Sequence, residues 1–306
     1  MSSVLECLPD GARLAVVRLR SMGDCILTTP AISILKQARP DLWISIVVEE
    51  RFASLFEGNP DVAEIFLPDA SRLRKWRPHL CLNLHGGSRS AALTAFSGAR
   101  FRAGFAHFQY SAIYNVRIPR AQEILGLERK VHTAEHLASA MFYLGASRVE
   151  IPRAKLFAAK GARARTPLPL CVIHPCASTL EKTWPADRFI ETASYVEKSF
   201  ELEPVFISGP GEDLSPFRRW RTLSAAPLAE IKSLMSGASL FIGNDSGPAH
   251  MAAAFGIPSV VIFGASDPVT WAPWRTQAEV LTGSDGTSSI GVHEAIEAFD
   301  RLRVRA

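Results

Sequence analysis

The stretch Phe241-Ile-Gly-Asn-Asp-Ser-Gly-Pro-Ala-His250 lies where the sequence predicts that a strand ends and a helix begins. The apolar residues 238–242 are typical of a buried strand. The small apolar residues 251–255 predict a helix, which Gly256 would end. Pro248 falls in the first helical turn, where a backbone N–H has no intrahelical partner, so proline is tolerated there. The sequence therefore predicts a strand, a polar turn and a helix in succession.

The polar turn between this strand and helix, residues 243–247, suits an anion. Free N–H groups and the helix dipole meet at a helix start, and phosphate is their usual ligand. A second strand, residues 258–263, also ends in a small polar turn, and neighbouring strand ends form ligand sites in open parallel sheets. In the alternative interpretation Asp245 and Ser246 only cap the helix, and His250 is an ordinary surface histidine. The clustering of these three side chains beside a second polar strand end favours a ligand site.

The composition is that of a soluble globular protein. The 306 residues, 47% apolar and 21% charged, suffice for one large or two ordinary domains. No apolar run approaches the roughly 20 residues that span a bilayer, and the first dozen residues lack the features of a signal peptide. Five cysteines without paired or zinc-type spacing predict reduced thiols in a cytoplasmic protein.

The net charge of +4 is modest, but basic residues gather in two segments of the first half, residues 72–77 and 100–120. Such a surface would attract an anionic substrate or a phospholipid surface. A solvated face is the simpler interpretation for any single arginine. No nucleic-acid-binding motif accompanies the charge, so we expect no nucleic-acid partner.

Strand-like and helix-like segments alternate along the chain, which predicts an α/β fold with a parallel sheet in each half. In the first half the predicted strands are residues 13–19, 42–48, 63–67, 77–84 and 101–105, and the predicted helices are residues 25–38, 51–57, 88–96 and 132–144. In the second half the strands are residues 170–174, 204–208, 238–242 and 258–263, and the helices are residues 186–200, 229–235, 251–255 and 293–302.

The composition changes over residues 152–169, where residues 160–169 resemble a linker or an exposed connection. We therefore expect a first domain over residues 1–158 and a second over residues 159–292. A closing helix would occupy residues 293–306.

Three further side chains follow predicted strands and are candidates for chemistry. Asp24 follows the first strand and is either a helix cap or a general base, without the G-x-G-x-x-G pattern of a dinucleotide site. Lys182 lies in the loop after the first strand of the second half and either reaches a phosphate or is simply solvated. Glu212 follows the next strand and suits a ribose hydroxyl pair or a helix start.

With these residues in place, the sequence resembles the bacterial heptosyltransferases, the ADP-heptose:lipopolysaccharide glycosyltransferases of family 9. The segments that carry the resemblance span nearly the whole chain in the expected order. They are Arg18-Leu-Arg-Ser-Met-Gly-Asp-Cys-Ile-Leu-Thr-Thr-Pro-Ala31, Val47-Val-Glu-Glu50, Lys182-Thr-Trp-Pro-Ala-Asp-Arg-Phe189, and Gly243-Asn-Asp-Ser-Gly-Pro-Ala-His-Met-Ala-Ala-Ala254 continuing to Phe263-Gly-Ala-Ser-Asp-Pro268.

The resemblance implies a GT-B fold, in which two Rossmann-like domains face each other across a cleft. It also implies an inverting, metal-independent transfer without a cofactor, in which the acceptor binds the N-terminal half and the nucleotide-sugar the C-terminal half. Asp24 would be the catalytic base. The resemblance assigns the diphosphate and sugar-diphosphate contacts to Ser178, Thr179, Lys182, Asp245, Ser246, Gly247 and His250, and the ribose contact to Glu212.

The expected partners are ADP-heptose and an anionic glycolipid, the lipopolysaccharide core or a related surface glycan, with peripheral contact at the inner membrane. Cys176 departs from the family, which often has glycine at this place, and its side chain would narrow the phosphate loop. Two alternatives keep the fold and change the function. One is a nucleotide-sugar epimerase, and the other is a module that binds a nucleotide without turnover.

Overall fold

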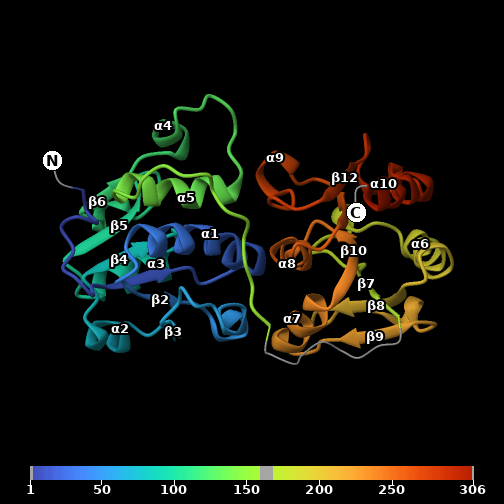
Figure 1. Cartoon of the computed structure of the whole chain (residues 1–306), viewed down its shortest axis with the longest axis horizontal. Coiled ribbons are helices and arrows are strands. Elements are labelled where there is room, and N and C mark those ends of the chain that lie inside the picture. The colour runs from blue at the N-terminus through green and yellow to red at the C-terminus, as the bar shows by residue number, and fades with distance from the viewer. Residues whose placement is uncertain (1–2, 159–167, 305–306) are drawn as a thin grey trace. The chain divides into compact units, whose positions relative to one another are not determined.

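The computed structural model describes residues 3–158 and 168–304, with the side chains of residues 303 and 304 left aside. The chain divides into two compact units, Met1–Phe157 and Ala158–Ala306, and each has its own sheet (Figure 1). Most of the linker predicted at residues 160–169 lies outside the described residues.

The first unit is built on six parallel strands in the order β3-β2-β1-β4-β5-β6, the strand order of a Rossmann fold. Apart from the half-buried Arg13 and the polar Asn83, the central strands β1 and β4 are apolar and buried, because helices cover both faces of such a sheet. Val17 at the end of β1 pairs with Val47 of β2 on one side and with Asn83 of β4 on the other. The strands are β1 (Arg13–Val17), β2 (Trp43–Val47), β3 (Glu64–Phe66), β4 (Leu80–Asn83), β5 (Phe101–Phe105) and β6 (Val116–Ile118).

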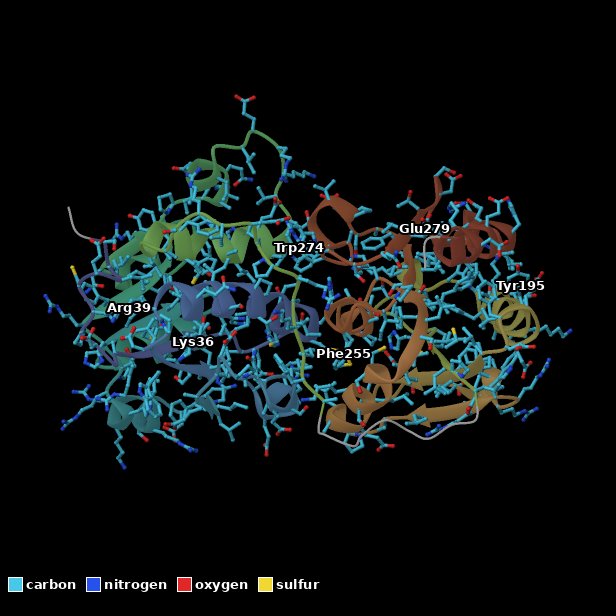
Figure 2. The ribbon with its side chains drawn as sticks, viewed as in Figure 1. Lys36, Arg39, Tyr195, Phe255, Trp274 and Glu279 are labelled. Carbon is cyan, nitrogen blue, oxygen red and sulfur yellow. The ribbon has the colours of Figure 1, made fainter. Side chains whose placement is uncertain are left out.

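The two longest helices of this unit, α1 (Met22–Ala38) and α5 (Thr133–Leu144), pack against each other. Arg39, labelled in Figure 2, follows α1 and donates to the carbonyl of Leu5 over 2.6 Å and to Asp41 over 2.7 Å. These contacts fasten the N-terminal segment to the unit. The remaining helices are η1 (Glu50–Leu55), α2 (Ala70–Trp76), α3 (Ser88–Phe96), η2 (Ser111–Ile113) and α4 (Ala121–Leu125).

The second unit repeats this topology with six parallel strands in the order β12-β11-β10-β7-β8-β9. Gly243 of β10 pairs with His174 of β7 and with Val261 of β11. The strands are β7 (Leu170–His174), β8 (Glu203–Ser208), β9 (Arg221–Ser224), β10 (Ala238–Asn244), β11 (Ser259–Phe263) and β12 (Ala278–Thr282).

A core of large aromatic and aliphatic side chains holds the helices of the second unit to its sheet. Trp184 is fully buried, packs edge-on against Phe189 with ring centroids 4.9 Å apart, and donates through Nε1 to the carbonyl of Ile290. The last helix, α10 (Val292–Val304), packs on α6, β11 and β12. The other helices are η3 (Leu180–Lys182), α6 (Ala186–Ser199), η4 (Ser215–Phe217), α7 (Leu228–Ser236), α8 (Gly247–Phe255), α9 (Pro268–Trp271) and η5 (Thr287–Ser289).

The strands and helices predicted from the sequence are present, but several ends differ. Helix α1 begins at Met22 rather than at residue 25, because small and polar residues fill its first turn and hide it from the apolar pattern. Helix α8 begins at Gly247, so Pro248 lies in its first turn as predicted. Strands β6, β9 and β12 and helices α2, α4 and α9 were not predicted.

Candidate active site

In both sheets the strand order reverses beside the central strands, and ligands of open α/β sheets bind outside the carboxyl ends at such a point. In the first unit the reversal falls between β1 and β4; Asp24 lies in the first turn of the helix that follows β1, and His85 lies in the loop after β4. In the second unit it falls between β7 and β10, which end at His174 and Asn244. Each unit therefore gathers polar side chains where its fold favours a ligand.

Asp24 lies in the first turn of α1 with both carboxylate oxygens occupied. Oδ1 accepts from Arg18 Nη2 over 3.0 Å, and Oδ2 accepts from the Ser21 hydroxyl over 3.1 Å and from the Ser21 N–H over 3.3 Å. The N-cap residue is Ser21, so the N-cap interpretation of Asp24 was wrong, but Asp24 closes the capping box from the third helical position. The Asp24 side chain remains 22% exposed, which leaves it within reach of a substrate.

Arg18 is the partner of Asp24 that the sequence analysis did not single out. Its side chain is only 8% exposed, and its Nε faces the Thr28 hydroxyl at 3.4 Å. Burial lowers the pKa of Arg18, and the carboxylate of Asp24 acts against this shift. The signal was present in the sequence, because Arg18 and Asp24 stand at the two ends of one short turn after the first strand.

In the second unit, the buried amide of Asn244 fastens the loop that carries the phosphate candidates. Asn244 Nδ2 donates to the Pro175 carbonyl over 2.8 Å, and Oδ1 accepts from the Trp184 N–H over 2.9 Å. One side chain thus holds both ends of the loop between β7 and α6. Asn244 belongs to the polar turn predicted from the sequence, but this clamping role was not predicted.

Ser178, Thr179 and Lys182 occupy this loop. Thr179 accepts at its carbonyl from the Lys182 N–H over 3.1 Å, which closes the short turn η3. Gly264, at the end of β11, lets η3 come close, because a Cβ at this position would lie 2.6 Å from the Glu181 carbonyl oxygen. The sequence placed Gly264 in a polar turn but could not show this contact.

Asp245 directly follows β10, and its N–H donates to the Ile262 carbonyl of β11 over 2.9 Å. Burial is the largest influence on its carboxyl and raises the pKa above the ordinary value. A hydrogen bond from Ser266 and the charge of Lys182 act in the opposite direction. The structure therefore brings Asp245 and Lys182, both predicted site residues, into electrostatic contact.

Ser246, His174 and Glu212 form a chain of polar contacts across three strand ends. The Ser246 hydroxyl lies 3.1 Å from His174 Nδ1, and His174 Nε2 lies 3.6 Å from Glu212 Oε2. The same Glu212 oxygen accepts from the Gly209 N–H over 2.6 Å. His174 and this N–H favour the ionised carboxylate, so the pKa of Glu212 lies below its ordinary value.

The first residues of α8 carry the remaining predicted side chains. The Ser246 hydroxyl donates to the Asn244 carbonyl over 2.9 Å and makes no hydrogen bond to the backbone of its own helix. Gly247 begins the helix, so the N–H groups of its first turn suit an anion. His250 is 5% exposed, with its ring centroid 6.4 Å from that of Trp271 in α9.

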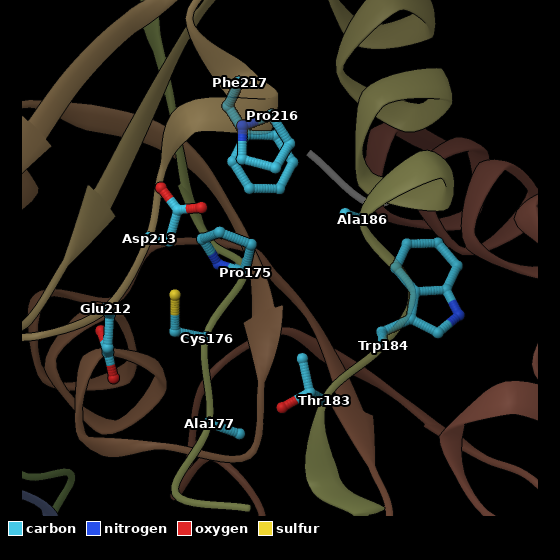
Figure 3. A pocket seen from close by; sticks show the side chains of 10 residues that line it. All are labelled: Pro175, Cys176, Ala177, Thr183, Trp184, Ala186, Glu212, Asp213, Pro216 and Phe217. Carbon is cyan, nitrogen blue, oxygen red and sulfur yellow. The ribbon is translucent and has the colours of Figure 1, made fainter. Parts of the chain in front are cut away.

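A pocket of about 250 Å³ opens beside Glu212 (Figure 3). In this view Glu212 and Asp213 lie on one side of the pocket, and Thr183 and Trp184 lie on the other. Cys176 lines the pocket, and burial together with the neighbouring Glu212 raises the pKa of its thiol to about 12. The thiol is therefore protonated at neutral pH and is a poor nucleophile.

Within residues 3–158 and 168–304, no group of three or more His, Cys, Asp and Glu side chains has an arrangement that could hold a metal ion. The same part of the chain contains no helix with the length and apolar character needed to cross a membrane.

The model of glycosyltransferase family 9 (heptosyltransferase) matches residues 70–294. The chain belongs to this family. Lipopolysaccharide heptosyltransferase 3 of Escherichia coli K12 is 28% identical over 84% of this chain and 83% of its own length. The family-9 resemblance inferred from the sequence is thereby confirmed.

Two solved structures show the same fold as this family-9 chain. A family-9 glycosyltransferase from Veillonella parvula superposes with a TM-score of 0.86 at 22% identity, covering 97% of this chain and 98% of its own. The Escherichia coli heptosyltransferase WaaC, solved with ADP, gives a TM-score of 0.79 at 19% identity over 95% of this chain and 99% of its own. The expected GT-B class with two Rossmann-like domains is confirmed.

Proposed function

We propose that this glycosyltransferase moves heptose from ADP-heptose to the lipopolysaccharide core or a related surface glycan. The observation that carries the proposal is the group of Lys182, Asp245 and the start of α8 at the point where the second sheet reverses its order. A cation and a helix N-terminus together suit a diphosphate. The family match and the relatives' names supply the sugar and the acceptor class.

In the proposed reaction, the acceptor hydroxyl attacks the anomeric carbon and the configuration inverts. Asp24 takes the proton of this hydroxyl as the C–O bond forms, while the bond to ADP breaks. A general base contributes about 10²–10⁴-fold to such a step. Arg18 and Ser21 hold the two oxygens of Asp24, so the carboxylate is already oriented in the free protein.

Departure of ADP places negative charge on its terminal phosphate. Lys182 and the N–H groups at the start of α8 would stabilise this charge, together with the hydroxyls of Ser178, Thr179 and Ser246. Glu212, held by His174 and Gly209, would bind the ribose hydroxyls. Gly247 would let the diphosphate approach the helix start, and His250 would support the sugar end from within α8. We further propose that the reaction needs no metal ion, which full activity in EDTA would support.

We assign acceptor binding to residues 1–158 and donor binding to residues 159–292, with residues 293–306 as the closing helix. The acceptor's lipid would bring the protein to the cytoplasmic face of the inner membrane. The exposed basic side chains of α2 and its C-cap, including Arg72, Lys75 and Arg77, support peripheral contact there. Flotation with anionic and neutral vesicles tests this, because a membrane role requires binding to anionic vesicles that salt reverses.

The deciding experiment measures ADP release from ADP-heptose with core lipids truncated at successive sugars. Asp24→Asn should reduce turnover at least a hundredfold and leave ADP affinity unchanged. Near-normal turnover of this variant would exclude Asp24 as the base. Lys182→Ala should weaken ADP binding, turnover or both.

Neither alternative function is favoured by the family or by the curated relatives. An epimerase would release an epimerised nucleotide-sugar without any acceptor. A binding module would bind ADP and release none from ADP-heptose with any core lipid.

A further inference from the structure

His85 lies at the same reversal point of the first sheet as Asp24 but has no part in the proposed reaction. It follows β4 by two residues, and β4 is the direct neighbour of β1. Asp24, Arg18 and Arg20 all act on the ring of His85 electrostatically. The histidine is therefore a close neighbour of the proposed base.

The turn that carries His85 is rigidly built. Asn83 is fully buried, and its Oδ1 accepts from the N–H groups of His85 and Gly86 over 2.9 and 3.1 Å. Its Nδ2 donates to the Ser90 hydroxyl and to the Tyr114 hydroxyl. Gly86 has φ of +84°, and a Cβ there would lie 2.8 Å from the Phe108 ring. Such a turn fixes where the side chain of His85 points.

The ring of His85 presents Nε2 as its accessible nitrogen. The side chain is partly exposed while Nδ1 is buried, and Nδ1 makes no hydrogen bond of normal geometry with any described residue. The Arg20 carbonyl lies close enough to act on the ring as a hydrogen-bond acceptor. On the Nε2 side stands Gly87, where a Cβ would lie 3.6 Å from Nε2. The absence of a side chain at Gly87 leaves this edge of the ring uncovered.

The ring is neutral at physiological pH, because burial and the charges of Arg18 and Arg20 lower the pKa of His85 more than the charge of Asp24 and the Arg20 carbonyl raise it. In the tautomer that carries its proton on the buried Nδ1, the neutral imidazole offers a lone pair on Nε2. Sugar hydroxyls are the natural donors to such a lone pair.

We propose that His85 binds the acceptor sugar, with Nε2 accepting a hydrogen bond from a hydroxyl next to the one that Asp24 deprotonates. This inference rests on the proposed function. The attacking hydroxyl has a single proton, which goes to Asp24, so His85 must bind a different hydroxyl of the same sugar. His85 would thereby select acceptors that carry a neighbouring hydroxyl in the correct orientation.

Two substitutions of His85 distinguish the roles of its two ring nitrogens. The amide of glutamine reaches the place of Nε2, whereas the shorter asparagine reaches only the place of Nδ1. With a core lipid that the wild-type protein glycosylates, His85→Asn should raise the acceptor KM about fivefold to tenfold, as expected for one lost hydrogen bond. His85→Gln should restore most of this loss. The donor KM and ADP affinity should stay within twofold of wild type in both variants.

Gly87→Ala provides an independent test, because its Cβ would make ordinary contacts with the ring, the nearest at 3.5 Å, and would cover the Nε2 edge without a clash. It should also raise the acceptor KM, with a melting temperature close to that of wild type. An acceptor KM unchanged by His85→Asn, or a donor KM that rises equally, would overturn the inference. Absence of transfer by the wild-type protein would instead refute the proposed function.

Discussion

Arg18 Nη2 and Asp24 Oδ1 lie 3.0 Å apart, and Arg18 is the more buried member of the pair. The Thr28 hydroxyl accepts from Arg18 Nε and limits the movement of the guanidinium. The guanidinium in turn fixes the direction of the Asp24 carboxylate. The oxygens of Asp24 are thus positioned before any substrate binds. The ion pair also places a permanent positive charge beside the proposed base.

Arg18→Met should lower kcat tenfold or more, since the carboxylate of Asp24 loses its main orienting contact. ADP affinity should be unchanged, because Asp24 and Lys182 belong to different units. Arg18→Lys keeps the charge without the planar geometry, so its kcat should lie between those of Arg18→Met and the wild-type protein. Steady-state kinetics with calorimetric ADP binding would test this, and a fully active Arg18→Met protein would contradict it.

Gly264→Ala should weaken ADP binding, since the added Cβ would lie 2.6 Å from the Glu181 carbonyl and 3.2 Å from Lys182 Cα. Displacing η3 should cost about 1–3 kcal/mol of stability, as overpacking usually does. Gly286→Ala is the matched control. Its site has φ of +84° and no atom within 4 Å of an added Cβ, so it strains the backbone without moving the loop. Equal loss of ADP affinity in both variants would exclude the proposed role of Gly264.

Asp245→Asn should raise the melting temperature of the ligand-free protein at pH 7. The folded-state pKa of Asp245 is raised above 3.8, so the ionised carboxylate that predominates at neutral pH opposes folding. This gain in melting temperature should shrink as the pH falls toward 3.8 and disappear below pH 3.8. Melting curves from pH 7 to pH 3 would measure this, and a lower melting temperature at pH 7 would contradict it.

Glu212→Gln should behave in the opposite way. Because the folded-state pKa of Glu212 lies below 4.5, its carboxylate stabilises the protein above pH 4.5, and this stability is lost as the pH falls through the folded-state value. The variant should therefore melt lower than wild type at pH 7, and the two should converge in acid. A difference in melting temperature that is independent of pH would show that His174 and Gly209 do not act through the charge of Glu212.

Cys176 should resist alkylation by iodoacetamide at pH 8, because its thiol has a pKa of about 12. The alkylation rate of Cys176 should be about a hundredfold or more below that of an ordinary thiol, since only the thiolate reacts. The exposed Cys7 should react first, as mass spectrometry of partly modified protein can show. If Cys176 narrows the phosphate loop as expected, Cys176→Gly should also change ADP affinity.

The sequence predicted every central strand but missed three strands at sheet edges, β6, β9 and β12. Central strands are buried on both faces and appear as apolar runs. An edge strand need not be buried, and β9, with the sequence Arg-Thr-Leu-Ser, is mostly exposed. Helix α2 was missed because Leu73 is its one buried residue, so it shows no apolar periodicity, although Asp69 is a good cap that accepts from the Ser71 N–H over 2.8 Å.

For the candidate site, the sequence located residues that follow strands but not the contacts between them. Asp245 and Lys182 are 63 positions apart, and only the folded loop brings their charges together. Arg18, His174 and His85 were missed as site residues because strand-end polar side chains are common and their partners lie on neighbouring strands. Gly264 was missed because a close backbone approach leaves no trace in a single sequence.

The two central strands that follow the reversal points, β4 and β10, both end in a fully buried asparagine. Asn244 clamps the loop between Pro175 and Trp184 at both ends, so the positions of these ends do not depend on the side chains of the eight residues between them. Those eight residues are free to change without rebuilding the sheet. This arrangement gives the scaffold evolvability, because donor preference can change through substitutions inside the loop while one amide keeps its ends in place.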